Sequence, residues 1–296
     1  MSLQHVADTE PSSARLAVRD RLLEGLPVAD KRLEIGGVST ALLEGGEGPP
    51  LVMLHGQGGF AVAWLRVIPR LAASHHVIVP DLPGLGESVV GSGELDAERV
   101  HAWLGELIEK TCAEPPTLVG ISLGGSIAAR FAVGHGASCR RVVLVDSGSL
   151  GPFRPALGAV AALIRLSVRP SEANLGRLFK QVVVDFERVQ AGLGERSSAF
   201  KAYGVERAST PSVQAANRRL LRLFGIRRIA ESDLARIRVP VALIWGRDDR
   251  VMPLRNAESA SARFGWPLYV IDNCGHFSIL DQPDAFIDAL HAAMAA

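Results

Sequence analysis

The sequence has few cysteines, little net charge and no long apolar run, and each shortage excludes a class of protein. Its three cysteines, Cys112, Cys139 and Cys274, are scattered and form no C-x-x-C pair, which argues against a disulfide framework and against a cysteine-based metal or redox site. The formal net charge of +1 leaves no basic excess to neutralise phosphates, so we expect no nucleic-acid partner. No uninterrupted stretch of about 18 apolar residues occurs, so we expect no membrane-spanning helix and no membrane partner.

The beginning of the chain also lacks the features of a secretory signal. Arg15, Arg19 and Arg21 interrupt its apolar residues, and no small-residue cleavage site follows them. We therefore interpret residues 1–30 as an N-terminal arm or short helix and predict a cytoplasmic protein. Cys112 and Cys139 are interpreted as small buried hydrophobic residues. Nothing in the sequence decides the oligomeric state, and a homo-oligomer is compatible with it.

The hydrophobic content of 48% over 296 residues is enough for one large core. Short β-branched runs bounded by turn residues alternate with helical patterns, which indicates an α/β protein with a mostly parallel sheet and helices on both faces. The runs assigned to strands are 51–54, 77–79, 117–119, 142–145, 241–244 and 268–271, after an antiparallel hairpin at 32–43 that turns at Gly36 and Gly37. Helical spacing is found at 98–109, 126–133 and 285–294.

The alternation stops after Asp146, and no convincing strand follows until Val239. Apolar residues repeat at helical spacing from Leu175 to Val189, and Thr210 followed by Pro211 is typical of a helix start. This pattern predicts a helical cap inserted into an α/β core. The expected organisation is a first core segment at 31–147, the cap at 148–232 and a second core segment at 233–296.

A candidate nucleophile lies at Ser122, in the stretch Gly-Ile-Ser-Leu-Gly-Gly that follows one predicted strand and opens the next helix. This setting is the one that the G-x-S-x-G nucleophile elbow requires, because the tight turn needs small residues such as Gly120 and Gly124 where the backbones pass. The positive end of the following helix also favours negative charge on a substrate oxygen. The alternative is a glycine-rich turn with an incidental serine.

The stretch His55-Gly56-Gln57-Gly-Gly directly follows the strand at 51–54. Glycines such as Gly56 let a backbone curl toward a reacting carbonyl, and free amides there can bind an oxyanion. We assign the amides of Gln57 and Leu123 as the oxyanion donors. His55 at the strand end is interpreted as a hydrogen-bonded residue that braces the loop rather than as a catalytic base.

Acidic candidates follow the strand at 241–244, at the carboxyl edge of the sheet where open α/β proteins bind their ligands. Asp249 is the preferred acid and Asp248 the weaker candidate, while Asp146 ends another strand and could supply the acid instead. Two solvated loop acids paired with Arg247 or Arg250 are the structural alternative.

The candidate base is His276, which lies on the loop between the last predicted strand and the last helix. The chain order of serine, aspartate and histidine is the order that an α/β-hydrolase architecture requires. Cys274 stands only two residues away, a range at which a thiol nucleophile could not easily meet its base. We therefore predict a triad of Ser122, Asp249 and His276.

With these motifs in order at the ends of separate strands, residues 31–296 resemble the α/β-hydrolase family. The resemblance implies a cap that shapes an acyl pocket, a small-molecule acyl substrate and neither a cofactor nor a metal. The stretch from Asp81 to Ser88 is similar to the family's loop after the next core strand, where the aspartate has a structural role.

Three functions stay open at this point. The first is hydrolysis of a small or medium apolar carboxylic ester, because the cap is rich in Leu, Val and Phe. The second is carbon–carbon bond hydrolysis, because residues 148–152, 245–250 and 274–276 resemble the meta-cleavage-product hydrolases, which act on vinylogous diketone acids. The third is a non-catalytic small-molecule binder with the same fold.

The second resemblance is incomplete. Those carbon–carbon hydrolases usually carry Asn before the nucleophile, Met after it and Trp after the histidine, where this chain has Ile121, Leu123 and Phe277. They also have a cap arginine that holds the substrate carboxylate, for which Arg188 and Arg207 are candidates. The departures favour the ester hydrolase.

Overall fold

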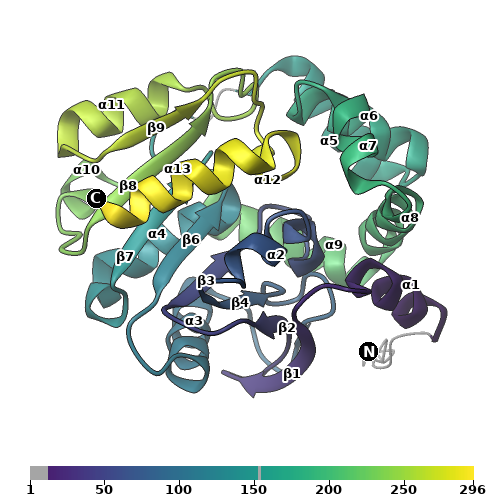
Figure 1. The fold of residues 1–296 in the computed structure, drawn as a ribbon, viewed down its shortest axis with the longest axis horizontal. Coiled ribbons are helices and arrows are strands. Elements are labelled where there is room, and N and C mark those ends of the chain that lie inside the picture. The colour runs from purple at the N-terminus through teal and green to yellow at the C-terminus, as the bar shows by residue number, and fades with distance from the viewer. Residues whose placement is uncertain (1–12, 153–154) are drawn as a thin grey trace, which may run out of the picture.

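The computed structural model describes residues 13–152 and 155–296, in which a nine-stranded, mostly parallel sheet forms the centre of the fold (Figure 1). The strand order is β1-β2-β4-β3-β6-β7-β8-β9, with β5 paired to β2; pairs among β4, β3, β6, β7, β8 and β9 are parallel, and those of β2 are antiparallel. The strands are β1 (Ala29–Ile35), β2 (Val38–Gly45), β3 (Pro50–Leu54), β4 (His76–Pro80), β5 (Val89–Val90), β6 (Thr117–Ile121), β7 (Arg141–Val145), β8 (Val241–Gly246) and β9 (Leu268–Ile271).

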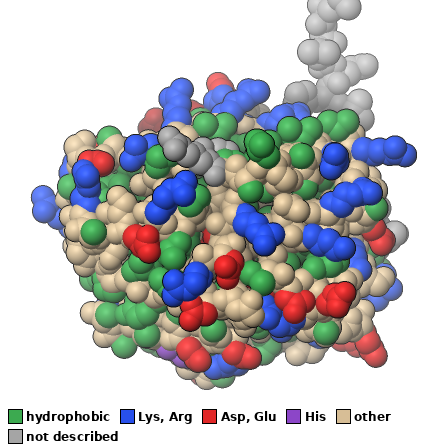
Figure 2. All heavy atoms as spheres, turned by 90° about the horizontal axis from the view of Figure 1, so that it is seen from above, with side chains coloured by type: hydrophobic (Ala, Val, Ile, Leu, Met, Phe, Trp, Pro, Cys, Tyr) green, Lys and Arg blue, Asp and Glu red, His purple; other side chains and the backbone are tan. Residues whose placement is uncertain are grey.

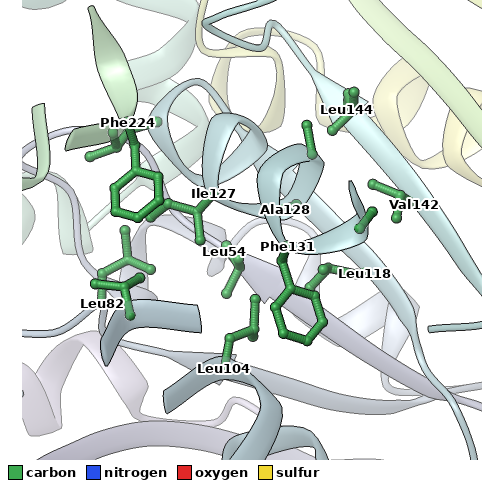
Figure 3. Close-up of a cluster of buried hydrophobic side chains, with 14 of the residues drawn as sticks. Leu54, Leu82, Leu104, Leu118, Ile127, Ala128, Phe131, Val142, Leu144 and Phe224 are labelled. Atoms are coloured by element: carbon green, nitrogen blue, oxygen red, sulfur yellow. The ribbon is translucent and has the colours of Figure 1, made fainter. Parts of the chain in front are cut away.

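Helices cover both faces of this sheet. One face packs against α3 (Ala97–Thr111), α4 (Leu123–His135) and α11 (Arg255–Phe264), and the other against α2 (Ile68–Leu71) and α13 (Pro283–Ala295). Every residue of β3, β6 and β8 is buried, because the side chains of these strands meet helices above and below. Figure 3 shows the first of these interfaces, where Ile127 and Phe131 of α4 pack among leucines of neighbouring elements. The predicted fold class is confirmed.

Between β7 and β8 the described residues form helices and no strand: α5 (Leu157–Val168), α6 (Glu172–Val182), α7 (Phe186–Leu193), α8 (Arg196–Ser209), α9 (Pro211–Leu220), a π-helical turn η3 (Leu221–Gly225) and α10 (Glu231–Leu234). Helices α5 to α8 gather at one side of the molecule, beyond the carboxyl ends of the parallel strands (Figure 1). They lie where the sequence predicts a cap. No helix in the described residues is long and apolar enough to cross a membrane.

Of two local expectations in this helical segment, one needs correction. The helical spacing from Leu175 to Val189 runs through a break, because the Asp185 side chain accepts from the Arg188 amide and starts a new helix, α7. The helix start predicted at Thr210 and Pro211 is confirmed, because α9 begins at Pro211 with Thr210 as its N-cap residue, although the Thr210 side chain makes no capping hydrogen bond. Its hydroxyl instead donates to the Glu206 carbonyl of the preceding helix.

The N-terminal segment forms a docked helix, α1 (Ser13–Leu23), and residues 1–12 of the predicted arm lie outside the described residues. Its Arg19 is 1% exposed and donates to Asp30 at 2.6 Å, and to Asp81 and the Tyr203 hydroxyl at 3.3 Å. Because Tyr203 belongs to α8, this arginine joins the start of the chain to both the core and the cap. Cys139 is buried as predicted, whereas Cys112 is only half-buried because it stands at the end of α3.

Candidate active site

Ser122 occupies the turn between β6 and α4 in a strained conformation. Its φ of 55° and ψ of −113° are unfavourable for a residue with a side chain. The Ser122 amide donates to the Val145 carbonyl at 2.9 Å, and its carbonyl accepts from the Gly148 amide at 3.2 Å. Both bonds come from the segment around the end of β7, so the neighbouring strand holds the turn that presents the serine.

The two flanking glycines are required by close backbone contacts. A Cβ at Gly120 would lie 2.4 Å from the Gly124 carbonyl oxygen, and a Cβ at Gly124 would lie 2.4 Å from the Leu54 carbonyl oxygen. Both distances are far below van der Waals contact, so a larger residue would force α4 away from β6 and β3. The glycines therefore set the loop after β3 directly against Ser122.

Ser122, His276 and Asp249 form a continuous hydrogen-bonded chain. His276 Nε2 lies 2.9 Å from Ser122 Oγ, and His276 Nδ1 lies 2.7 Å from Asp249 Oδ2. All three residues are buried, with exposed fractions of 8%, 5% and 8% for the serine, histidine and aspartate. Side chains from the ends of β6, β8 and β9 thus meet at one sheet edge with the spacing that proton transfer from a serine to a histidine needs.

The surroundings of Asp249 distinguish it from the other acids. Its Oδ1 accepts from the amides of Val251 and Met252 at 2.7 and 2.9 Å, which leaves Oδ2 for the histidine. Asp248 is exposed and has no side-chain contact with His276 in the described structure. Asp146 is fully buried, and its Oδ1 accepts from the Gly246 amide at 2.8 Å. Burial and the nearby Asp249 carboxylate raise the pKa of Asp146 well above its usual value.

The pKa of His276 predicts an acid limb in the pH profile of the enzyme. Burial lowers this pKa, but the charge and hydrogen bond of Asp249 outweigh burial and leave it above the usual 6.5. A base must be neutral to take the serine proton, so activity falls as the pH drops through the raised pKa. We expect kcat/KM to reach half of its plateau at a pH above 6.5, measured with an ester whose own hydrolysis is insensitive to pH. A half-maximum below pH 6 would contradict this assignment.

The predicted oxyanion donors lie beside the serine. Gln57, Leu123 and Ser122 line the same cavity. Neither the Gln57 amide nor the Leu123 amide donates a hydrogen bond to another residue in the described part of the chain. Gly56 makes this approach possible, because a Cβ there would lie only 3.2 Å from the Ser122 Cβ. Leu123 is the first residue of α4, so its amide is one of the unpaired donors at a helix start.

The contacts of His55 fit the bracing role expected from the sequence. Its Nε2 accepts from the Leu82 amide at 3.0 Å, and Nδ1 lies 2.9 Å from the Gly56 carbonyl, to which it donates. Burial lowers the pKa of His55, which keeps the ring neutral in this arrangement. Asp81 accepts from the amides of Ala61 and Glu87 and organises the loop after β4.

Cys274 lies beside the site but is unsuited to attack. It is fully buried, and its thiol lies 3.6 Å from the Gly275 carbonyl, to which it donates. Burial and the carboxylates of Asp146, Asp281 and Asp249 raise its pKa, so the reactive thiolate is disfavoured.

Asp281, which the sequence analysis did not single out, anchors the histidine loop. It is fully buried at the end of α12 (Ser278–Asp281), and its Oδ2 accepts from the amides of Gly275 and Val184 at 2.8 Å. Its Oδ1 binds the Arg188 guanidinium at 2.7 Å. One carboxylate thus ties the residue before His276 to the start of α7. No signal in the sequence distinguishes Asp281 from exposed Asp284 three positions later.

A cavity of about 310 Å³ opens over Ser122 and runs under the cap helices. Its walls come from the core loops and from α5, α6, α8, α9 and η3, and they are mostly aliphatic and aromatic. The apolar lining includes Phe60, Val160, Leu163, Ile164, Leu166, Leu175, Leu178, Phe179, Val182, Phe200, Val213, Leu221, Ile226, Met252 and Phe277. Among the residues that the structure describes, Arg207 is the only ionisable side chain lining it apart from His276.

Neither candidate arginine is free to hold a substrate carboxylate. The Arg207 guanidinium donates to the Gly86 carbonyl at 2.9 Å and to the Glu206 carboxylate. Arg188 does not line the cavity and is engaged by Asp281. Each charge is already balanced within the protein.

The doubly covered parallel sheet and the hydrogen-bonded serine, histidine and aspartate at its carboxyl edge define a hydrolase. The chain belongs to the alpha/beta hydrolase family, whose model matches residues 51–289. The resemblance noted in the sequence is therefore confirmed.

Relatives with different named activities share this family. The chain is 28% identical over 267 residues to a 2-hydroxy-6-oxo-2,4-heptadienoate hydrolase of Pseudomonas putida, covering 88% of this chain and 94% of the relative. It is 27% identical over 259 residues to a pimeloyl-[acyl-carrier protein] methyl ester esterase of Aeromonas hydrophila, covering 86% and 98%. The fold matches a 2-hydroxy-6-oxo-6-phenylhexa-2,4-dienoate hydrolase of a Rhodococcus strain with a TM-score of 0.78 at 24% identity, covering 91% of this chain and 99% of that one.

Proposed function

We propose that this hydrolase cleaves small or medium apolar carboxylic esters through an acyl-enzyme on Ser122. The observation that carries the proposal is the environment of the Ser122 hydroxyl, which is hydrogen-bonded to His276 and opens into a cavity with almost no charge. An uncharged acyl chain and its alcohol lose little hydration on entering such a cavity, whereas a charged substrate would need a partner there.

The reaction follows from the hydrogen-bonded chain. His276 Nε2 takes the Ser122 proton as Oγ attacks the ester carbonyl carbon, and Asp249 holds the protonated ring through Nδ1. The tetrahedral oxyanion accepts from the amides of Gln57 and Leu123, each worth about 3 kcal/mol in the transition state. His276 then gives its proton to the departing alcohol, and water repeats the sequence to release the acid.

Carbon–carbon bond hydrolysis is the second candidate, and the dienoate hydrolase relative supports it. A substrate of that class carries a carboxylate, whose burial in an apolar cavity requires a cation. Arg207 is the only arginine or lysine among the described residues that line the cavity, and it is already bound to Glu206 and to the Gly86 carbonyl. The ester hypothesis needs no such cation, and the methyl ester esterase relative supports it.

A substrate panel separates these candidates. We expect kcat/KM for p-nitrophenyl butyrate and hexanoate to be at least about a hundredfold higher than for a 2-hydroxy-6-oxo-hexadienoate, because an unpaired carboxylate costs several kcal/mol to bury. Turnover of the yellow dienoate is measured by the loss of its colour. A dienoate rate equal to or above the ester rate would favour the carbon–carbon hydrolase instead.

The non-catalytic alternative predicts an inert serine. A fluorophosphonate reacts with an activated serine, and intact-mass measurement detects the added group. We expect one adduct on the wild-type chain and none on Ser122→Ala. A folded wild-type protein that stays unlabelled would support the ligand-binding protein.

A further inference from the structure

The outer side of α5 carries an apolar stripe. Leu157, Ile164 and Val168 are 88%, 57% and 79% exposed, although most residues of this size are buried in the fold. Their spacings of seven and four residues place them on one face of the helix. No described residue covers this face, so about three turns of helix present aliphatic side chains to water.

The stripe reaches the mouth of the active-site cavity. Ile164 lines the cavity and is also more than half exposed, so it stands at the rim. Ile226, which follows η3, has the same two properties, with an exposed fraction of 52%. The cavity therefore opens between α5 and the segment around Ile226, and apolar side chains line the passage from the outer surface inward.

Basic side chains surround this mouth. Exposed Arg165 lies on α5, exposed Arg169 directly follows that helix, and exposed Arg227 and Arg228 follow Ile226. None of the four side chains forms an ion pair within the described structure. Arg250 is also exposed beside α5, because its carbonyl accepts from the Ala156 amide at 2.8 Å.

Acidic residues are scarce at the same place. Residues 155–171 and 210–230 contain no Asp or Glu, and the exposed acids nearest to them in the chain are Glu172 and Glu231. On the wider face seen in Figure 2, Lys and Arg side chains lie among hydrophobic ones, and Asp and Glu side chains are present as well.

We propose that the α5 stripe and its basic rim dock the enzyme peripherally on an anionic phospholipid surface, with the cavity mouth facing the lipid. An apolar helix face flanked by arginines is the arrangement that inserts at the boundary between headgroups and acyl chains. A second copy of the chain fits less well, because a two-fold contact through this face would set arginines against arginines. The absence of a spanning segment, from which the sequence predicts no membrane partner, does not bear on peripheral docking.

Vesicle flotation tests the proposal with vesicles of phosphatidylglycerol and phosphatidylcholine mixed in equal parts, and with pure phosphatidylcholine. We expect the wild-type chain to float with the anionic vesicles, and to do so at least about tenfold less with pure phosphatidylcholine or in 1 M salt. Leu157→Ser/Val168→Ser should lower binding at least about tenfold. Arg165→Glu/Arg169→Glu should do the same.

Matched changes elsewhere provide the controls. Val89→Ser replaces another exposed valine. Arg140→Glu replaces an exposed arginine just before β7, at the amino ends of the parallel strands. Both variants should float like the wild type. Leu157 and Val168 do not line the cavity, so the Leu157→Ser/Val168→Ser variant should turn over p-nitrophenyl acetate like the wild type. Unchanged turnover also shows that this variant is folded. Ser122→Ala should float fully, which separates docking from catalysis.

Three results would overturn the proposal. The first is wild-type protein that does not float with anionic vesicles. The second is wild-type binding by both double variants. The third is a dimer, detected by light scattering, that the Leu157→Ser/Val168→Ser change dissociates, because a second copy would then cover the stripe.

Discussion

Ser122→Ala is expected to reduce kcat for ester hydrolysis by about 10⁶-fold, because removing a nucleophile that acts as a unit with its base leaves only binding and oxyanion stabilisation. The fold should persist, since the strained turn is held by backbone bonds from Val145 and Gly148 that alanine also makes. The measurement is steady-state turnover of p-nitrophenyl butyrate, with circular dichroism to verify folding. A correctly folded variant with wild-type turnover would refute the assignment.

Cys274→Ala is the matched control for this prediction. The thiol lies close to His276 in the chain, but the Ser122 hydroxyl and not the Cys274 thiol is hydrogen-bonded to the ring. We expect Cys274→Ala to keep turnover within about threefold of the wild type, with a loss of stability of about 1 kcal/mol for a small vacated volume. A loss of activity as deep as that of Ser122→Ala would make the cysteine the nucleophile.

Asp249→Asn is expected to lower kcat by about 10⁴-fold with little change in KM. The asparagine can still accept from the amides of Val251 and Met252, but it would present an NH₂ group to His276 Nδ1. That contact favours the ring tautomer with its proton on Nε2, which cannot accept a proton from Ser122. The measurement is the same ester assay, with the pH profile recorded for the variant.

Asp146→Asn distinguishes the two buried acids. Asp146 is hydrogen-bonded to the Gly246 amide and acts on the His276 ring only through its charge, without a hydrogen bond to it. Its replacement by a residue of the same shape should therefore lower kcat by less than about tenfold. If Asp146→Asn were the more damaging change, the acid would belong to the end of β7 rather than to the loop after β8.

The core could be predicted from the sequence because its strands are covered on both faces. Such strands are apolar throughout, as in the run from Leu51 to Leu54, and the turn residues that bound them are visible directly. The order of Ser122, Asp249 and His276 was equally visible, since each follows a recognisable strand. Gly120 and Gly124 further indicated the tight turn at the nucleophile, because the close backbone contacts there leave no room for a side chain.

The cap and its anchors could not be predicted in this way. The break between α6 and α7 is hidden because the apolar spacing continues across it, while Asp185 caps α7 and Asp281 binds the Val184 amide. That second interaction joins residues 97 positions apart, and no local pattern reports it. The sequence likewise does not distinguish Arg207 or Arg188 from an arginine that is free to bind a substrate. Only their hydrogen-bond partners in the structure show that neither is available.

The Asp281 carboxylate ties one end of the cap to the core. It holds the Gly275 amide and the Val184 amide with one oxygen, so lifting α7 from the core would also displace the loop that carries His276. Ile164 and Ile226 at the mouth line the cavity, whereas Asp281 and Val184 do not. Substrate can therefore pass on the α5 side without dismantling the aligned serine, histidine and aspartate. Admission of substrate and assembly of the catalytic machinery are separate events, and the machinery is complete before the substrate arrives.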